Sequence, residues 1–134
     1  MVIICAPICE EIIFRFVIIE KIQTKYKPVI AIIVSTILFS LIHFYPLSAT
    51  ITIFVTFLGI AYIYVHTKNL IYTIVIHFLN NFFTTIVSIV NKYYPNITIP
   101  KILSISIEYI VLAVLLVVGF YLMYKEHNKL KTVS

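Results

Sequence analysis

Three charged side chains, Glu10, Glu11 and Arg15, lie inside an otherwise apolar run near the start of the sequence. An ionised Glu or Arg at the centre of a lipid bilayer costs about 2.5–3.5 kcal/mol, so such groups pair with each other or serve a function. Glu11 and Arg15 are four residues apart, in the favourable order for an ion pair on one helix face. Glu10 is turned about 100° away and stays free to act as a general base. A charge cluster that only locks helices together explains this segment alone equally well.

Three further polar side chains lie on two later apolar stretches, and each has a structural interpretation as well as a chemical one. His43 alone would more often be a packed, hydrogen-bonded residue than a catalyst. His77 and Asn81 are four residues apart and share a helix face, with Asn80 rotated off it. If the stretches converge, Glu10 and His43 can activate a water molecule. His77 and Asn81 can then donate hydrogen bonds to a developing oxyanion.

This set of side chains suits the hydrolysis of an amide bond without a Ser or Cys nucleophile. Two histidines and one carboxylate with an open position are also a zinc hydrolase arrangement. The alternative to direct water activation is therefore a zinc ion held by Glu10, His43 and His77.

The elements that must position these residues are membrane-spanning helices. The 134 residues are 62% hydrophobic and 11% charged, whereas about a quarter of the residues in soluble domains are charged. Five apolar stretches are long enough to cross a bilayer: residues 2–19, 28–47, 48–65, 70–90 and 102–124. We predict an all-α, polytopic bundle of about five spans that forms a single domain over residues 1–134.

The net charge of +5 does not indicate nucleic-acid binding, because no basic stripe with interleaved aromatic residues is present. The lysines instead predict orientation. Successive loops of a helical bundle lie on alternate sides of the membrane, and this places most of the lysines on one side. By the positive-inside rule that side is cytoplasmic. We therefore expect a multi-pass protein of the cell membrane with a cytoplasmic C-terminus and a site reached from the cytoplasm. The lysines on that side are Lys21, Lys25, Lys27, Lys68, Lys125, Lys129 and Lys131, against Lys92 and Lys101 on the other.

The remaining features are less specific. Cys5 and Cys9 lie one helical turn apart without a second Cys pair, and small apolar packing residues are the favoured interpretation. The chain opens with its most polar helix, which leaves a polar face to be covered. We therefore expect either additional helices before it or a second copy of the chain in a homo-oligomer.

Three short motifs resemble those of one family of membrane proteases. The segment A-P-I-C-E-E-I-I-F-R at 6–15 resembles the E-E-x-x-x-R motif of the CAAX protease and bacteriocin-processing (CPBP, Abi) family. F-S-L-I-H at 39–43 matches its F-x-x-x-H motif, and H-F-L-N-N at 77–81 matches its H-x-x-x-N motif. Each motif alone is weak, but three in the right order, each on its own predicted span, form a specific pattern.

The resemblance implies an intramembrane endopeptidase similar to type II CAAX prenyl endopeptidases. In that family the first Glu and the motif-two His activate the attacking water, and the motif-three His and Asn form the oxyanion hole. The family is described both as a metalloprotease and as a metal-free glutamate protease, and Asn81 as a poor zinc ligand favours the second. The implied catalytic residues are Glu10, His43, His77 and Asn81, and the implied structural ion pair is Glu11 and Arg15.

Two departures from the family pattern are visible. The family's eight-helix core has about three more helices before the first motif, whereas nine residues precede Glu10 here. The resemblance therefore implies the C-terminal part of that core, shortened at its N-terminus. The small Gly common after the motif-one Arg is Phe16 in this chain.

The implied substrates are membrane-proximal peptides, either a prenylated C-terminal tail or a bacterial peptide precursor. The main alternative is a non-catalytic bacteriocin-immunity or regulatory protein of the same family that acts by binding. A transporter is less favoured, because mid-span Gly or Pro pairs typical of broken helices are absent.

Overall fold

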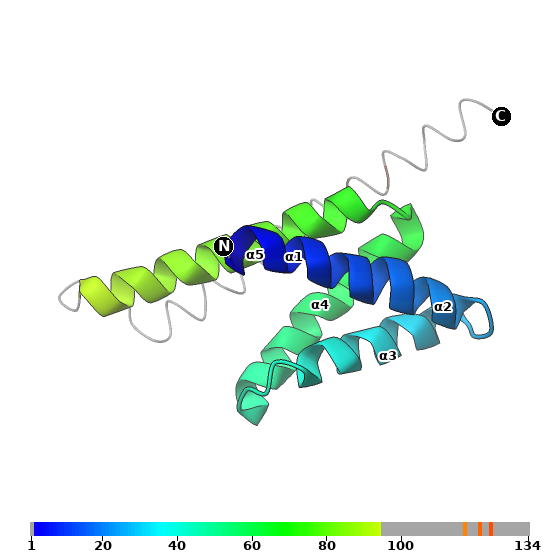
Figure 1. Ribbon diagram of the computed structural model, residues 1–134, viewed down its shortest axis with the longest axis horizontal. Coiled ribbons are helices and arrows are strands. Elements are labelled where there is room, and N and C mark those ends of the chain that lie inside the picture. The colour runs from blue at the N-terminus through cyan, green and yellow to red at the C-terminus, as the bar shows by residue number, and fades with distance from the viewer. Residues whose placement is uncertain (1, 95–116, 118–120, 122–123, 125–134) are drawn as a thin grey trace.

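The computed structural model describes residues 2–94 together with 117, 121 and 124. All regular elements in this part of the chain are helical, as predicted (Figure 1). They are α1 (Val2–Glu11), the π-helix η1 (Ile12–Ile19), α2 (Glu20–Gln23), α3 (Pro28–Leu41), α4 (Leu47–Thr67) and α5 (Leu70–Tyr93). The fifth predicted span, residues 102–124, lies outside the described residues, apart from the three single positions 117, 121 and 124.

The first three elements form one continuous helix, because the residues at both junctions keep right-handed helical backbone angles. Its central turns, Ile12–Ile19, are wound as a π-helix, a rare form that occurs frequently at functional sites. Figure 1 shows the first part of this long helix, α1, beside α5, and the two are in direct contact. The two polar segments of the sequence, 10–15 and 77–81, are therefore carried by neighbouring helices.

The second predicted span was expected to reach residue 47, but α3 ends at Leu41. Pro46 disfavours helical geometry at the residue before it, Tyr45. Phe44 adopts a left-handed backbone conformation with φ 52°, which also stops the helix. His43 consequently lies in the turn between α3 and α4, at the opposite end of α3 from Lys27.

The core is apolar and centred on α4, which contributes to two packed clusters. One contains Phe14, Phe39, Phe57, Ile60, Ile63 and Ile76, and the other contains Ile19, Ala31, Ile32, Ala61 and Tyr64. The aromatic side chains of the first cluster, Phe14, Phe39 and Phe57, come from three elements, and His77 and Arg15 pack against them.

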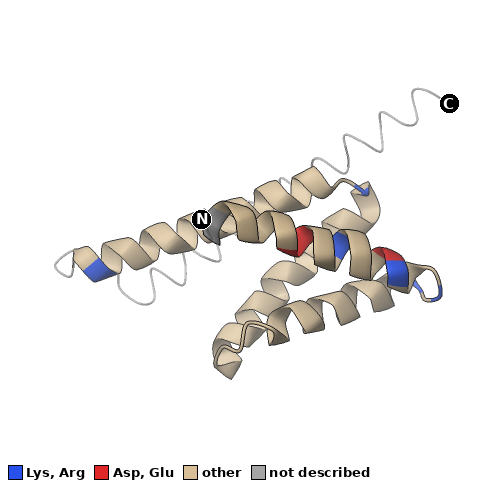
Figure 2. Cartoon of the chain, in the orientation of Figure 1, with Lys and Arg blue, Asp and Glu red and all other residues tan. Residues whose placement is uncertain are grey.

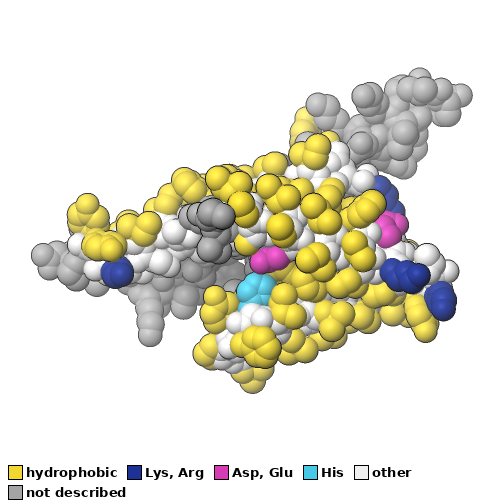
Figure 3. Space-filling view, in the orientation of Figure 1, with side chains coloured by type: hydrophobic (Ala, Val, Ile, Leu, Met, Phe, Trp, Pro, Cys, Tyr) yellow, Lys and Arg dark blue, Asp and Glu magenta, His cyan; other side chains and the backbone are white. Residues whose placement is uncertain are grey.

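Most of the outer surface is also apolar, as Figure 3 shows for one face. Soluble monomers rarely expose contiguous apolar patches of more than a few hundred Å². In the described part, α4 with 21 residues and α5 with 24 are long and apolar enough to cross a membrane, and α3 is a shorter apolar helix. This surface indicates a helical membrane protein.

A polar junction fixes the turn between α4 and α5. Lys68 caps α4 with a left-handed φ of 53°, and its ammonium group donates to Glu20 Oε1 at 2.6 Å and to Gln23 Oε1. The Asn69 side chain accepts a hydrogen bond from the Ile71 amide and so starts α5. Figure 2 shows charged residues gathered at this end of the bundle. The junction joins the end of the first helix to the turn between α4 and α5.

Candidate active site

A buried ion pair forms the base of the site. Arg15 Nε donates to Glu11 Oε2 at 3.0 Å, and both side chains are fully buried. Arg15 Nη1 donates to Ser35 Oγ at 3.2 Å, and that hydroxyl donates to the Phe14 carbonyl at 2.8 Å. The guanidinium group also lies over the ring of Phe39, 5.5 Å from its centroid. Glu11 and Arg15 thus join the first helix to α3 inside the bundle.

His77 lies between the two carboxylates of the first helix. Its Nδ1 is 3.0 Å from Glu11 Oε1, and its Nε2 is 3.6 Å from Glu10 Oε2. Consecutive residues point about 100° apart on a helix, which allows Glu10 and Glu11 to reach different edges of one ring. The edge of the buried imidazole also packs against Phe57, with centroids 4.5 Å apart. The ring orientation is therefore set by polar contacts on two sides and by aromatic packing.

His43 is held in one orientation by its own helix. Its Nδ1 lies 2.8 Å from the Phe39 carbonyl oxygen, which can only accept a hydrogen bond. The proton of a neutral His43 ring is consequently assigned to Nδ1, and the Nε2 lone pair is left to accept a proton. The four-residue spacing places His43, in the turn after α3, within reach of the carbonyl group of Phe39.

One pocket of about 430 Å³ brings the predicted residues together, although they come from three separate segments. Glu10, His43, His77 and Asn81 all line it. Glu10 is about a quarter exposed, with 26% of its side-chain surface accessible, whereas His77 is buried. Figure 3 shows acidic and histidine side chains next to each other on an otherwise apolar face. The described pocket lining is Ala6, Glu10, His43, Tyr45, Ile53, Phe57, His77, Asn80, Asn81, Thr84 and Thr85.

Three features of the site were not predicted from the sequence. Asn80 was placed off the functional face, but it lines the pocket beside Asn81 because the pocket spans more than one face of α5. Ser35 was not singled out, although it lies four residues before Phe39 and therefore on the motif-bearing face of α3. The bond between Glu11 and His77 was also missed, and no local spacing could have revealed it.

The zinc alternative requires several ligand side chains close together. Zinc in proteins takes three or four His, Cys, Asp or Glu ligands. Within residues 2–94 no three such side chains are grouped closely enough to hold a metal ion. No chemical step is therefore assigned to a metal here.

The two cysteines lie outside the pocket, and both are exposed. If the pocket hydrolyses peptides, as the motifs imply, a double substitution, Cys5→Ser with Cys9→Ser, should keep the rate within about twofold of the wild type, because neither thiol lines the pocket to act as a nucleophile. Initial cleavage rates of both proteins in lipid vesicles would test this. A rate reduced by orders of magnitude would instead identify a thiol mechanism.

Taken together, these elements define a helical membrane protein with a polar, carboxylate- and histidine-lined pocket inside an apolar bundle. The model of the family described as type II CAAX prenyl endopeptidase Rce1-like matches residues 1–83. The match covers more than half of the chain, and the protein belongs to this family of membrane proteases. Neither a curated protein nor a solved structure gave a match.

Proposed function

We propose that this protein is an intramembrane endopeptidase that hydrolyses a peptide bond of a membrane-associated substrate, such as a prenylated C-a-a-X tail or a bacterial peptide precursor. The observation that carries the proposal is the shared pocket of Glu10, His43, His77 and Asn81. Membership of the CAAX endopeptidase family supports the same reaction class.

The attacking water is activated from two sides. It binds between the Glu10 carboxylate and His43 Nε2, and gives up a proton to Glu10 as its oxygen attacks the peptide carbonyl carbon. Hydrogen bonding of Nδ1 to the Phe39 carbonyl leaves His43 Nε2 as an acceptor toward this water. The proton later passes to the leaving amine, so the carboxylate is regenerated when the C–N bond breaks.

The tetrahedral oxyanion is stabilised by donors from α5. The Asn81 amide supplies one N–H group, and His77 supplies a second when Nε2 carries a proton. Glu11 accepts a hydrogen bond from His77 Nδ1 at 3.0 Å and so holds the ring with Nε2 toward Glu10. Arg15 in turn holds Glu11, so the ion pair acts on the reaction only by positioning His77.

We further propose a multi-pass arrangement with a cytoplasmic C-terminus, supported by the lysines gathered near α2. His43 lies at the opposite end of α3 from these lysines. In this orientation the pocket is closer to the outer end of the bundle, and substrate would reach it from there. Under this proposal the substrate enters from the outer side, in place of the cytoplasmic access expected from the sequence.

The proposed reaction can be tested with the purified chain in lipid vesicles and a farnesylated peptide that ends in Cys-Val-Ile-Ala. Mass spectrometry should detect the released tripeptide and the shortened farnesylated peptide, and EDTA should not suppress them. Failure of the folded protein to cleave either this peptide or unprenylated bacterial precursor peptides would refute the proposal. Protection of cells from a bacteriocin without any cleavage would favour the non-catalytic alternative.

A further inference from the structure

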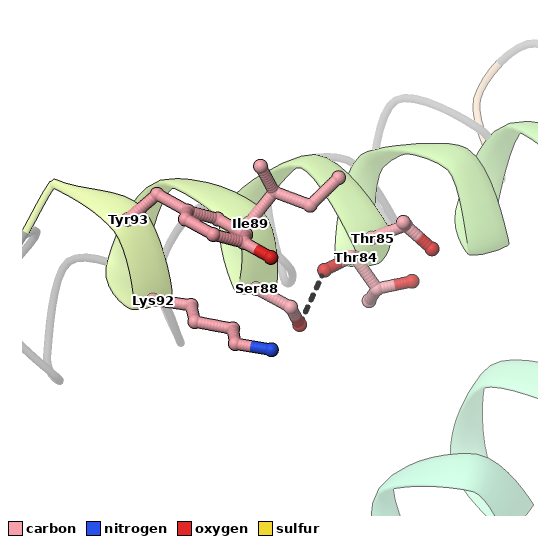
Figure 4. A pocket seen from close by; sticks show the side chains of 6 residues that line it. All are labelled: Thr84, Thr85, Ser88, Ile89, Lys92 and Tyr93. Atoms are coloured by element: carbon pink, nitrogen blue, oxygen red, sulfur yellow. Dashed lines mark hydrogen bonds between the residues drawn. The ribbon is translucent and has the colours of Figure 1, made fainter.

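A polar stripe leads away from the pocket along α5. Thr84, Thr85 and Ser88 follow Asn81 at spacings of three or four residues, and Lys92 comes one turn after Ser88, so all lie on one side of the helix. A second pocket of about 460 Å³ lies along this stripe and shares Thr84 and Thr85 with the first (Figure 4). The two pockets meet at Thr84 and Thr85, and together we call them the α5 track. The second is lined by Thr84, Thr85, Ser88, Ile89, Lys92 and Tyr93 among the described residues.

The hydroxyl groups of this track present hydrogen-bond acceptors. Thr84 donates its proton to the Asn80 carbonyl at 2.7 Å, and Thr85 donates to the Asn81 carbonyl at 2.7 Å. Ser88 donates to the Thr84 carbonyl at 2.8 Å, as Figure 4 shows. A hydroxyl has one proton and two lone pairs, so only lone pairs remain for a ligand in the track. Backbone N–H groups of an extended peptide are suitable donors to such a row.

The far end of the track carries a cation. Lys92 is exposed, and its ammonium group lies 5.2 Å from the centroid of the Tyr93 ring. Figure 4 shows the side chain extending back along the helix toward Ser88. No acidic residue is among the described residues that line this second pocket. An ammonium group with three donors at the end of a row of acceptors is complementary to a chain that terminates in a carboxylate.

The length of the track limits what can bind between the two ends. The helical rise of about 1.5 Å per residue puts Lys92 about 16 Å along the axis from Asn81. The extended lysine side chain covers about 6 Å of this distance. The remaining 10 Å or so corresponds to about three residues of extended peptide at roughly 3.3 Å each. Three residues also follow the modified cysteine in a C-a-a-X tail.

We propose that the α5 track binds the C-terminal three residues of the substrate, with Lys92 paired to the terminal carboxylate and Thr84, Thr85 and Ser88 accepting from its backbone amides. The proposal rests on the proposed function and adds to it the recognition of a free C-terminus. It predicts that internal peptide segments without a nearby carboxylate are poor ligands.

Equilibrium binding tests this proposal separately from catalysis. The probes are a fluorescent farnesylated peptide ending in Cys-Val-Ile-Ala with a free carboxylate and the same peptide with a C-terminal amide. Their affinities are measured for the Glu10→Gln protein in lipid nanodiscs, in which turnover is blocked. The acid should bind about ten times more tightly than the amide, as is typical of a hydrogen bond between two charged groups.

Substitutions at Lys92 give the decisive comparison. Lys92→Met in the Glu10→Gln protein should remove the preference for the acid, and Lys92→Arg should keep most of it. Lys27→Met is the matched control, because it removes one exposed lysine at the other end of the bundle and should keep the preference. Three outcomes would overturn the proposal. The Glu10→Gln protein could bind the acid and the amide equally well, it could keep its preference for the acid after Lys92→Met, or it could bind neither peptide. A Lys92-dependent preference without cleavage by the wild type would refute the protease function alone.

Discussion

Replacing Glu10 with Gln is expected to lower the rate of peptide hydrolysis by about 10²- to 10⁴-fold, the usual contribution of a positioned general base. Glutamine keeps the size of the side chain and can still contact His77 Nε2, which lies 3.6 Å from Glu10 Oε2. It cannot accept the proton of the attacking water. Because Glu10 is partly exposed and Arg15 pairs with Glu11 instead, the fold should remain intact.

Initial rates with the farnesylated peptide in vesicles would measure this loss, and thermal unfolding would verify the fold. Glu20→Gln is a matched control, since it removes the same charge from the same continuous helix at an exposed position. Its rate should stay within about twofold of the wild type, because a surface ion pair contributes little. Wild-type rates in the Glu10→Gln protein would contradict the assignment, and so would an equal loss in the Glu20→Gln protein.

Replacing Arg15 with Met is expected to lower the free energy of unfolding by about 3–5 kcal/mol, the cost of leaving a buried charge without its partner. Glu11 is fully buried and accepts from Arg15 at 3.0 Å, so removal of the guanidinium group strands its carboxylate inside the bundle. The substitution also removes the hydrogen bond to Ser35 and the contact with the Phe39 ring. Equilibrium unfolding in mixed micelles with increasing SDS would measure the effect.

The double variant Glu11→Gln with Arg15→Met separates lost charge pairing from lost packing. It leaves no ionised group unpaired at these two positions and should recover part of the lost stability. Lys68→Met serves as the exposed comparison and should change the free energy of unfolding by about 1 kcal/mol or less. A single Arg15→Met protein as stable as the wild type would show that the pair does not hold the helices together. A double variant no more stable than the single one would show that packing, not charge, accounts for the loss.

Much of the fold was predictable because its signals are local. The apolar stretches indicated an all-helical membrane protein, and proline at 28 and 46 coincides with the starts of α3 and α4. The Glu11–Arg15 pair also follows from a four-residue spacing within one helix. The early end of α3 at Leu41 was not predicted, because hydropathy continues past the helix while the backbone is stopped by Phe44 and Pro46.

The sequence by itself determined the helical class, the faces on which Glu10, His43, His77 and Asn81 lie, and the motifs that mark the family. Only the tertiary structure decided that Glu10 and Glu11 hold His77 from two sides, and that Asn80 and Thr84 share its pocket. Helical periodicity relates residues within one helix, whereas Glu11 and His77 are 66 positions apart. Their contact depends on how α1 packs against α5.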